Sequence, residues 1–366
     1  MHLLVTVTLN PNQFRSHVEP IAALPEVEEL TLVADAPGPD MDKLRTVVPP
    51  VWLTRVAGRA VAKLLTGLVI AWRERPSWIL GYNLVPHALN AVILAKLTGA
   101  RSYVHVIGGP AEWRGGGYES DNKLLSRLTR PVPIIERILV RFLRAADVVA
   151  VMGRRAREDL IELGVRPERI IVLPAAVDPE RVRPHNGERR YDVVTASQLI
   201  SRKRLHELLQ AVAMIRDRHP DIRVAIAGRG PLEDALAAEA RRLGIADAVD
   251  FLGFVADVES VYADGRIFVL PSQREGLSIA MTEAMASGVP VVVTDIGEAR
   301  DVVVHGDNGF LFEVGDVPAM AEHISALLSD PQLWGRMSAA AVEAVRQTSS
   351  PERITAVNRS VLIDAA

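Results

Sequence analysis

The chain contains no cysteine, and its 366 residues include no uninterrupted apolar run long enough to span a bilayer. Without cysteine there is no disulfide framework and no thiolate ligand or nucleophile, which favours a cytoplasmic protein. The most apolar stretch, 84–100, is interrupted by His87, Asn90 and Lys96, whereas a transmembrane helix needs about 20 apolar residues. The first residues lack the basic region and cleavage site of a signal peptide. We therefore expect neither a membrane-spanning segment nor a leader.

The chain is long and rich in apolar residues, enough for more than one hydrophobic core. At 366 residues, with 49% hydrophobic residues and a mean hydropathy of +0.15, it exceeds what one core usually serves. Strand-like and helix-like segments alternate from end to end, which is typical of parallel sheets covered by helices. A Pro-rich, charged segment at 174–190 indicates a linker. We predict two Rossmann-like α/β domains at 1–180 and 181–350, and a C-terminal helix at 351–366 that packs outside the second sheet or back on the first domain.

The net charge of −3 is unevenly distributed along the chain. Residues 1–185 contain 24 Lys and Arg against 19 Asp and Glu, whereas the remainder contains 18 against 26. Two basic amphipathic segments lie in this first half: 52–75, with Arg55, Arg59 and Lys63 at helical spacing, and 130–144. Such segments suit an anionic membrane surface. More often, however, such a basic stripe is simply the solvated side of a Rossmann helix.

Several loops of the first domain are expected at the carboxyl ends of its strands. The segment 10–17 reads as a polar loop after a first strand at 3–7. A strand at 77–81 is followed by Tyr82, Asn83 and His87, and a strand at 102–107 by a segment with five glycines in ten residues. Such a glycine-rich segment predicts a mobile loop rather than a regular element.

The stretch 266–295 predicts a parallel βαβ unit in the second domain. A short apolar run ends at Pro271, a helical segment with small residues follows, and Gly288 ends it before a β-branched run. Glu275 lies in the loop after the first strand, and Glu283 lies in the helix. Ligands bind at the carboxyl ends of strands in open parallel sheets, so both acids are expected to face one crevice.

Three further loops are expected on the same side of the second sheet. They are 197–204 with Lys203, the glycine turn 228–231, and 253–255. A cationic loop, a glycine loop and a helix amino end with free N–H groups together suit a phosphate or diphosphate. A carboxylate on the adjacent helix, Glu283, can accept from ribose hydroxyls. A dinucleotide motif is weakly supported, because Gly228 and Gly230 lack the third glycine.

These residues resemble a known family. The run EGLSIAMTE at 275–283, followed by AMASGVPVVVTDIG and DNGFLF, is similar to the E-x7-E signature of retaining GT-B glycosyltransferases of family 4. QLISRKRLHELLQAV, GRGPL, VDFLGFV and ERIIVLPAAVDPERVRP extend the resemblance. It covers 145–350 densely and the first 145 residues by topology. It implies an α/β GT-B fold, two Rossmann-like domains whose parallel sheets face a central cleft.

The resemblance implies that the second domain binds a nucleotide sugar. Glu283 would hold the ribose, Lys203 the diphosphate and Glu275 a sugar hydroxyl. The family usually has an arginine five residues before the lysine, and here that position is Gln198, so Arg202 or Arg204 would supply the missing charge or diphosphate binding is weaker. The implied donor-binding residues are Gln198, Arg202, Lys203, Gly230, Phe254, Val255, Glu275, Gly276, Leu277, Ser278 and Glu283.

The resemblance assigns acceptor binding to the first domain. The glycine pair that the family carries after its first strand is absent, so Asn12, Arg15 and His17 would contact acceptor there. His105 matches a histidine of the family and is expected to be catalytic together with Glu275 and Lys203. The implied acceptor-binding residues are Asn12, His17, Asn83, His105, Gly108 and Gly109.

The implied enzyme is a retaining, metal-independent hexosyltransferase that uses a UDP- or GDP-sugar. Its acceptor would be a saccharide, or a lipid-linked or cell-surface polysaccharide precursor. The expected location is the cytoplasm, with the inner membrane face as an alternative. We expect no cofactor and no nucleic-acid partner; the only D-x-D, Asp40 to Asp42, suits a solvated turn. A GT-B epimerase or phosphorylase, and a non-catalytic GT-B binding protein, remain alternatives.

Overall fold

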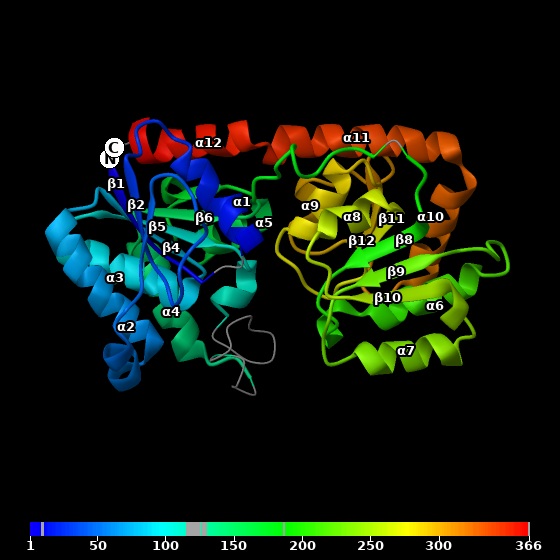
Figure 1. The fold of residues 1–366 in the computed structure, drawn as a ribbon, viewed down its shortest axis with the longest axis horizontal. Coiled ribbons are helices and arrows are strands. Elements are labelled where there is room, and N and C mark those ends of the chain that lie inside the picture. The colour runs from blue at the N-terminus through cyan, green and yellow to red at the C-terminus, as the bar shows by residue number, and fades with distance from the viewer. Residues whose placement is uncertain (9–10, 115–124, 126–129, 186, 365–366) are drawn as a thin grey trace. The chain divides into compact units, whose positions relative to one another are not determined.

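The computed structural model describes residues 1–8, 11–114, 125, 130–185 and 187–364 (Figure 1). The chain divides into two compact units: unit 1 is Met1–Ala176 with Pro351–Ala366, and unit 2 is Val177–Ser350. Each unit is built around one parallel sheet with helices on both faces. The α/β fold with two Rossmann-like domains that the sequence predicts is therefore confirmed.

Unit 1 contains a seven-stranded parallel sheet in the order β3-β2-β1-β4-β5-β6-β7. Its strands are β1 (His2–Thr6), β2 (Glu29–Val33), β3 (Leu44–Val47), β4 (Trp78–Tyr82), β5 (Arg101–Val106), β6 (Val148–Val151) and β7 (Ile170–Val172). Its helices are α1 (Pro11–Ala22), α2 (Val51–Glu74), α3 (Leu89–Thr98), α4 (Pro133–Ala145), α5 (Arg154–Glu162) and α12 (Pro351–Arg359). The strands are near-continuous apolar runs because both faces of the sheet are covered.

The two faces of this sheet pack against different helices. Leu3 and Val5 of β1 pack in one core cluster with α1 and α12, whereas Leu4 packs in another with α2 and α3. Alternate side chains of a strand point to opposite faces, so the same run of residues serves both clusters. On the second half of the sheet, Val104 and Val149 pack against α4 and α5.

The C-terminal segment packs on unit 1. Trp78 donates an indole hydrogen bond to the carbonyl of Leu362 at 3.1 Å, and the Tyr103 hydroxyl donates to Asn358 at 3.3 Å. Ile354 is fully buried in the same cluster as α1. Residues 351–362 thus complete the core of the first unit although unit 2 precedes them in the chain.

Two expectations for unit 1 are wrong. The segment 10–17 is not a loop, because α1 begins at Pro11 and buries Phe14, Val18 and Ile21 at helical spacing against the sheet. The basic stripe on 52–75 is also not one face of a helix. Gly58 has a φ of 77° and interrupts α2, and Lys63 beyond it is buried rather than solvated.

Unit 2 contains a six-stranded parallel sheet in the order β10-β9-β8-β11-β12-β13. Its strands are β8 (Tyr191–Ala196), β9 (Val224–Ala227), β10 (Val249–Gly253), β11 (Gly265–Leu270), β12 (Val291–Thr294) and β13 (Gly309–Phe312). Its helices are α6 (Leu205–Ile215), α7 (Glu233–Arg242), α8 (Val258–Ala263), α9 (Ile279–Ala286), α10 (Val317–Ser329) and α11 (Pro331–Ser349). β11, α9 and β12 form the βαβ unit that the sequence predicts. The strand order reverses between β8 and β11, which is where ligands bind in such sheets.

The packing of α12 leads to a stability prediction. Ile354→Ala should lower the free energy of unfolding of unit 1 by about 2–5 kcal/mol, because it leaves a cavity in a buried cluster. Glu352→Ala, at an exposed position of the same helix, should change it by less than about 0.5 kcal/mol. Hydrogen exchange of the β4 and β5 amides in urea measures both, and equal protection in the two variants would contradict the packing role of α12.

Candidate active site

Lys203 and Glu275 meet at the point where the strand order of unit 2 reverses. Lys203 follows β8 and Glu275 follows β11, and the Lys203 ammonium donates to Glu275 Oε1. Their side chains are 12% and 16% exposed, so water screens the pair only partly. The Gln273 amide donates to the carbonyl of Arg202 at 2.7 Å, which ties the two loops together. The ion pair is therefore held by two loops from neighbouring strands.

The loop after β8 directs its cations in different directions. Ser201–Lys203 forms a 3-10 turn, and Arg204 follows in the left-handed region with a φ of 49°. The Arg204 guanidinium donates to the buried carboxylate of Glu207 on α6. Gln198, at the position where the resemblance implies an arginine, is exposed. Lys203 is the cation of this loop that pairs with Glu275.

The amino end of α9 lies beside Glu275. Ser278 is the N-cap, and its hydroxyl accepts from the Met281 amide at 3.3 Å. Glu275, Gly276 and Ser278 line a small cavity with residues of β11 and β12. A Cβ at Gly297 would lie 2.2 Å from the carbonyl of Glu275, so only glycine lets the following loop support this turn. The first N–H groups of a helix and its dipole attract an anion.

The glycine turn 228–230 packs on the Lys203 loop. A Cβ at Gly228 would lie 1.8 Å from the Ser197 carbonyl, and one at Gly230 would lie 2.3 Å from the Leu199 carbonyl. The Gly228 amide also donates to the carbonyl of Gly253 at 2.7 Å. These glycines therefore bring the loops after β8, β9 and β10 into close contact.

The side chains beyond β10 and along α9 differ strongly in exposure. Phe254 is 73% exposed, which leaves an aromatic face available at the carboxyl edge of the sheet. Val255 is half-buried, and Leu277 is buried in front of α9. The structure thus places all the expected donor residues on the loops and the helix at this edge.

Glu283 lies deeper than Glu275. Its carboxyl group is buried and accepts a hydrogen bond from the Tyr262 hydroxyl at 3.2 Å. Burial raises the pKa of Glu283 to about 7, the charge of Glu259 adds to this shift, and Tyr262 and Arg181 oppose it. Arg181 itself pairs with Glu259. The carboxyl group therefore titrates near neutral pH. A ligand that donates hydrogen bonds to it would favour its charged form.

In unit 1, His17 and His105 are buried against each other. Their ring centroids are 4.8 Å apart in an edge-to-face arrangement, and both side chains are at most 2% exposed. Burial lowers the pKa of His105 to about 4 and that of His17 well below its usual value. Both rings are therefore neutral at pH 7, and as the structure stands neither is accessible from solvent.

The other expected acceptor residues lie in the segments after β4 and β5. The Asn83 amide donates to the carbonyl of His105 at 3.0 Å. The carboxylate of Glu112 accepts from the Gly108 amide at 2.5 Å and from the Leu84 amide. Gly109 begins a 3-10 turn, so the expected mobile loop is partly ordered, and its remaining glycines lie outside the described residues. The side chain of Asn12 also lies outside the described part of the chain.

A polar network at the carboxyl ends of β1, β2 and β4 was largely missed by the sequence reasoning. His87 contacts Thr6 through Nδ1 and Thr8 through Nε2, each at 3.0 Å. The Lys63 ammonium donates to Thr8 at 3.3 Å and to Asp35 at 2.7 Å. Burial lowers the pKa of His87 to about 3, and the charge of Lys63 adds to this. Strand order reverses between β1 and β4, so this network occupies the ligand-binding position of unit 1.

The only signal for this network in the sequence is positional. Asp35 directly follows a segment at 28–34 whose composition predicts a strand, and His87 follows the strand expected at 77–81 by a few residues. Lys63 gives no signal, because its partners lie 28 and 55 positions away in the chain.

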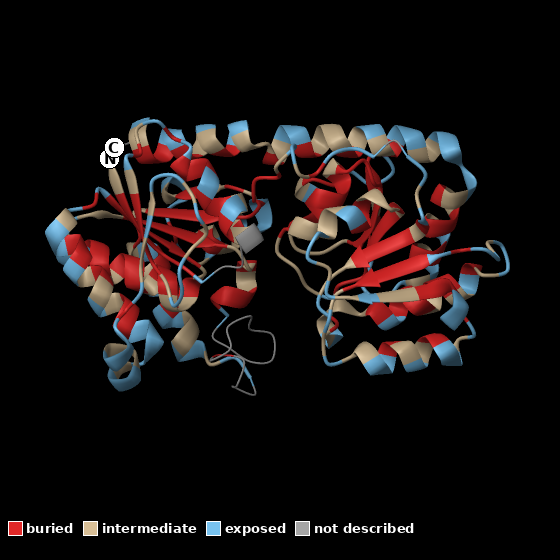
Figure 2. Cartoon of the chain, in the orientation of Figure 1, coloured by how far each residue is buried: buried red, intermediate tan, exposed pale blue. Residues whose placement is uncertain are grey.

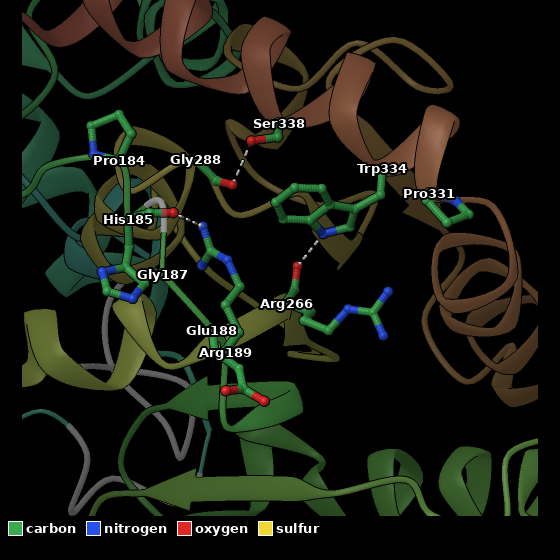
Figure 3. Close-up of a pocket in the computed structure, with 10 residues that line it drawn as sticks. All are labelled: Pro184, His185, Gly187, Glu188, Arg189, Arg266, Gly288, Pro331, Trp334 and Ser338. Atoms are coloured by element: carbon green, nitrogen blue, oxygen red, sulfur yellow. Dashed lines mark hydrogen bonds between the residues drawn. The ribbon is translucent and has the colours of Figure 1, made fainter.

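A larger cavity lies at the opposite edge of the unit 2 sheet (Figure 3). Its wall includes Arg189, whose guanidinium donates to the carbonyls of His185 and Gly265 and lies 5.2 Å from the ring of Trp334. Trp334 in turn donates to the carbonyl of Arg266 at 2.7 Å. These contacts anchor the linker to α11, at the amino ends of the strands and away from Lys203 and Glu275.

Comparisons with known proteins agree over most of the chain. Residues 15–176 match a glycosyl transferase 4-like domain, and residues 177–344 match the glycosyl transferases group 1. An N-acetyl-alpha-D-glucosaminyl L-malate synthase of Bacillus anthracis is 27% identical over 81% of this chain and 76% of its own length. A GDP-mannose-dependent alpha-(1-6)-phosphatidylinositol monomannoside mannosyltransferase of Mycolicibacterium smegmatis is 32% identical over 57% of this chain and 60% of its own.

The structural comparison agrees in fold. The crystal structure of Anabaena HepE in complex with UDP superposes with a TM-score of 0.79 at 20% identity, covering 99% of both chains. The chain spans about half the length of some curated relatives, 46% and 47% in two cases.

The raised pKa of Glu283 predicts a pH-dependent stability difference. A carboxyl with a folded pKa of about 7 stabilises the fold at low pH, and this contribution is lost as pH rises through 7. Glu283→Gln should therefore gain about 3 kcal/mol in unfolding free energy over the wild type between pH 4.5 and pH 8. Exchange of the β11 and β12 amides in urea measures the difference at both values.

The control for this prediction is Glu313→Gln, because Glu313 is exposed. Its stability relative to the wild type should be the same at both pH values. A Glu283→Gln difference that is equally independent of pH would show that the buried carboxyl does not titrate in this range.

Proposed function

The chain belongs to the glycosyl transferases of group 1, and from this premise we propose that it transfers a hexose from a UDP- or GDP-sugar to an acceptor hydroxyl with retention of configuration. The observation that supports the proposal most directly is the Lys203–Glu275 pair beside the amino end of α9. HepE crystallised with UDP and with UDP-glucose, and the mycobacterial relative is named as using GDP-mannose. The proposal therefore retains both UDP and GDP as candidate nucleotides of the donor sugar.

In this proposal Lys203 and the α9 amino end bind the diphosphate. An ammonium has three donor hydrogens, so the bond to Glu275 leaves two for phosphate oxygens. Negative charge grows on the diphosphate as the sugar departs, and preorganised donors aimed at that charge lower the barrier. No metal ion is needed in the proposed step, because Lys203 and the helix end supply the positive charge.

The remaining donor residues take the roles that their positions suit. Glu275 accepts from a sugar hydroxyl through its second oxygen, and Glu283 accepts from the ribose hydroxyls. The exposed ring of Phe254 borders the base. Gln198 replaces the expected arginine, so in the proposal the positive charge that faces the diphosphate comes from Lys203 and from either Arg202 or Arg204.

The proposed reaction exchanges one bond to the anomeric carbon for another. The bond from C1 to the phosphate oxygen breaks, the acceptor oxygen bonds to C1 on the same face, and the acceptor proton passes to the leaving phosphate. No protein nucleophile is required. We place the acceptor at the carboxyl edge of the unit 1 sheet, near Asn83, Gly108 and Gly109, with His87 held beneath by Thr6 and Thr8.

The buried pair His17 and His105 suits a supporting role in this proposal. Both rings are buried against each other and neutral at pH 7. The backbone carbonyl of His105 accepts a hydrogen bond from the Asn83 amide, which links His105 to one of the proposed acceptor-binding residues. The acceptor itself is proposed to be a lipid-linked or cell-surface polysaccharide precursor.

The donor nucleotide can be identified by thermal shift. UDP, GDP and ADP, each free and as a sugar derivative, are added to the whole chain. The nucleotide that binds should stabilise it by about 2.7 kcal/mol at 100 times its dissociation constant, and the shift should be smaller with Lys203→Gln. If all three nucleotides leave the transition unchanged, the donor assignment is wrong.

Substitution of the ion pair should reduce donor turnover. Lys203→Gln, which can still donate to Glu275, and Glu275→Gln should each lower kcat/KM by about 100-fold in EDTA, because each removes an interaction made with the developing charge or the sugar. Arg241→Gln and Glu313→Gln are exposed controls in the same unit and should retain wild-type rates.

Product analysis separates the proposal from its alternatives. A transferase gives glycosylated acceptor or slow donor hydrolysis, whereas an epimer formed from donor alone would contradict the proposal. Wild-type rates in both ion-pair variants would also contradict it, because the charge would then come from elsewhere.

A further inference from the structure

Helix α2 exposes large apolar side chains along its outer surface. Figure 2 shows pale blue and tan segments along this helix beside buried ones. The exposed apolar residues of the α2 face are Val51, Trp52, Val56, Val61, Leu65, Val69 and Trp72. Val56 reaches 83% exposure and Trp52 66%. Single exposed apolar residues are normal, but a group on one helix marks an interaction surface.

The spacing of these residues makes them one stripe after the kink at Gly58. Val61, Leu65, Val69 and Trp72 are separated by four, four and three residues, so they lie on one face of the helix. The opposite face carries Ala62, Lys63, Gly67, Ile70 and Ala71, which are buried against the sheet and α3. A helix that is apolar on both sides is normally buried on both sides.

The charged residues of the stretch 48–73 are all basic. Residues 48–73 contain no Asp or Glu, and Arg55, Arg59, Arg73 and Arg75 are exposed. Within the described residues none of these four guanidinium groups takes part in an ion pair. Glu74, the first acid after the stretch, is held by Arg45 at 2.6 Å. The face is therefore complementary to an anionic partner.

We infer that the α2 face docks on an anionic lipid surface, with α2 lying in the plane of the headgroups. Aromatic and aliphatic side chains flanked by arginines are the composition of interfacial helices. Tryptophan near each end of the helix suits the boundary between headgroups and acyl chains. The lack of acidic residues across 48–73 favours lipid over a protein partner, whose surface would carry both signs. Within the described residues, no helix is long and apolar enough to cross a bilayer, so the association would be peripheral.

The inference is tested by flotation of the full chain with vesicles of phosphatidylcholine, alone or with phosphatidylglycerol. Binding should require phosphatidylglycerol and weaken as salt rises. Arg55→Glu and Arg59→Glu should each lower the partition coefficient at least fivefold, since one basic residue near the surface contributes about that factor. Arg241→Glu, an exposed arginine of α7, should leave it unchanged.

Apolar contact is tested separately from charge. Val56→Asp and Trp72→Glu should reduce binding at least tenfold even at low salt, whereas Val304→Asp, at an exposed valine of unit 2, should not. Brominated lipids should quench the fluorescence of Trp52 and Trp72, and Trp72→Phe should reduce the quenching. Trp78 and Trp113 are buried, so lipid should quench their fluorescence little.

Two results would overturn the inference. One is failure of the wild type to float with phosphatidylglycerol vesicles at low salt. The other is a lipid-independent dimer, seen by sedimentation, that Trp72→Glu dissociates, because the α2 face would then be an interface between copies. Donor hydrolysis in solution is measured without vesicles, so failure of lipid docking can be distinguished from failure of the proposed reaction.

Discussion

All the strand pairs that form the two sheets are parallel, and this constraint decides where chemistry can occur. In a parallel sheet every loop that follows a strand emerges at the same edge. At the reversal of strand order two such loops diverge and leave space between them. Lys203 and Glu275 meet at that position in unit 2, and His87 and Thr8 lie at the corresponding position in unit 1. The polar groups of both units therefore follow from sheet topology.

The polar groups at these edges are costly for the fold. Taking Lys203 and Glu275 partly out of water carries a desolvation cost that opposes their attraction. Glu283 adds a buried carboxyl whose pKa is raised to about 7. A chain selected only for stability would have apolar side chains at such positions. Polar groups at buried positions that bring no gain in stability are expected at functional sites. For this reason Lys203, Glu275 and Glu283 are given the proposed donor chemistry.

Much of the fold could be predicted from the sequence because local pattern and tertiary structure agree in the βαβ unit. The strand expected near 267–270 is β11 at Gly265–Leu270, and the run 291–294 is β12. The segment 10–17 misled the prediction, because α1 shows its apolar side only through Phe14, Val18 and Ile21 among polar neighbours. Its helical state depends on a sheet that the local sequence does not contain.

The candidate site was predictable to the extent that its residues belong to one local motif. Glu275, Ser278 and Glu283 lie within nine positions, and their relation is set by a loop and a helix start. The different depth of the two acids was not predictable, since Tyr262 approaches Glu283 from α8. The same holds for His87, whose hydroxyl partners are 79 and 81 positions away. Long-range contacts decide protonation, and sequence spacing alone does not report them.

Helix α2 connects the two unassigned features of unit 1. Its inner side carries Lys63, which bonds with Asp35 and with Thr8 beside His87, and its outer side carries the α2 face. The non-helical Gly58 separates the first turns from the part that is packed on the sheet. A surface that engages the outer side of α2 would therefore hold the helix that supports the polar network at the carboxyl edge. Lipid docking and acceptor placement would then depend on the same element, because the part of α2 after Gly58 carries both Lys63 and most of the α2 face.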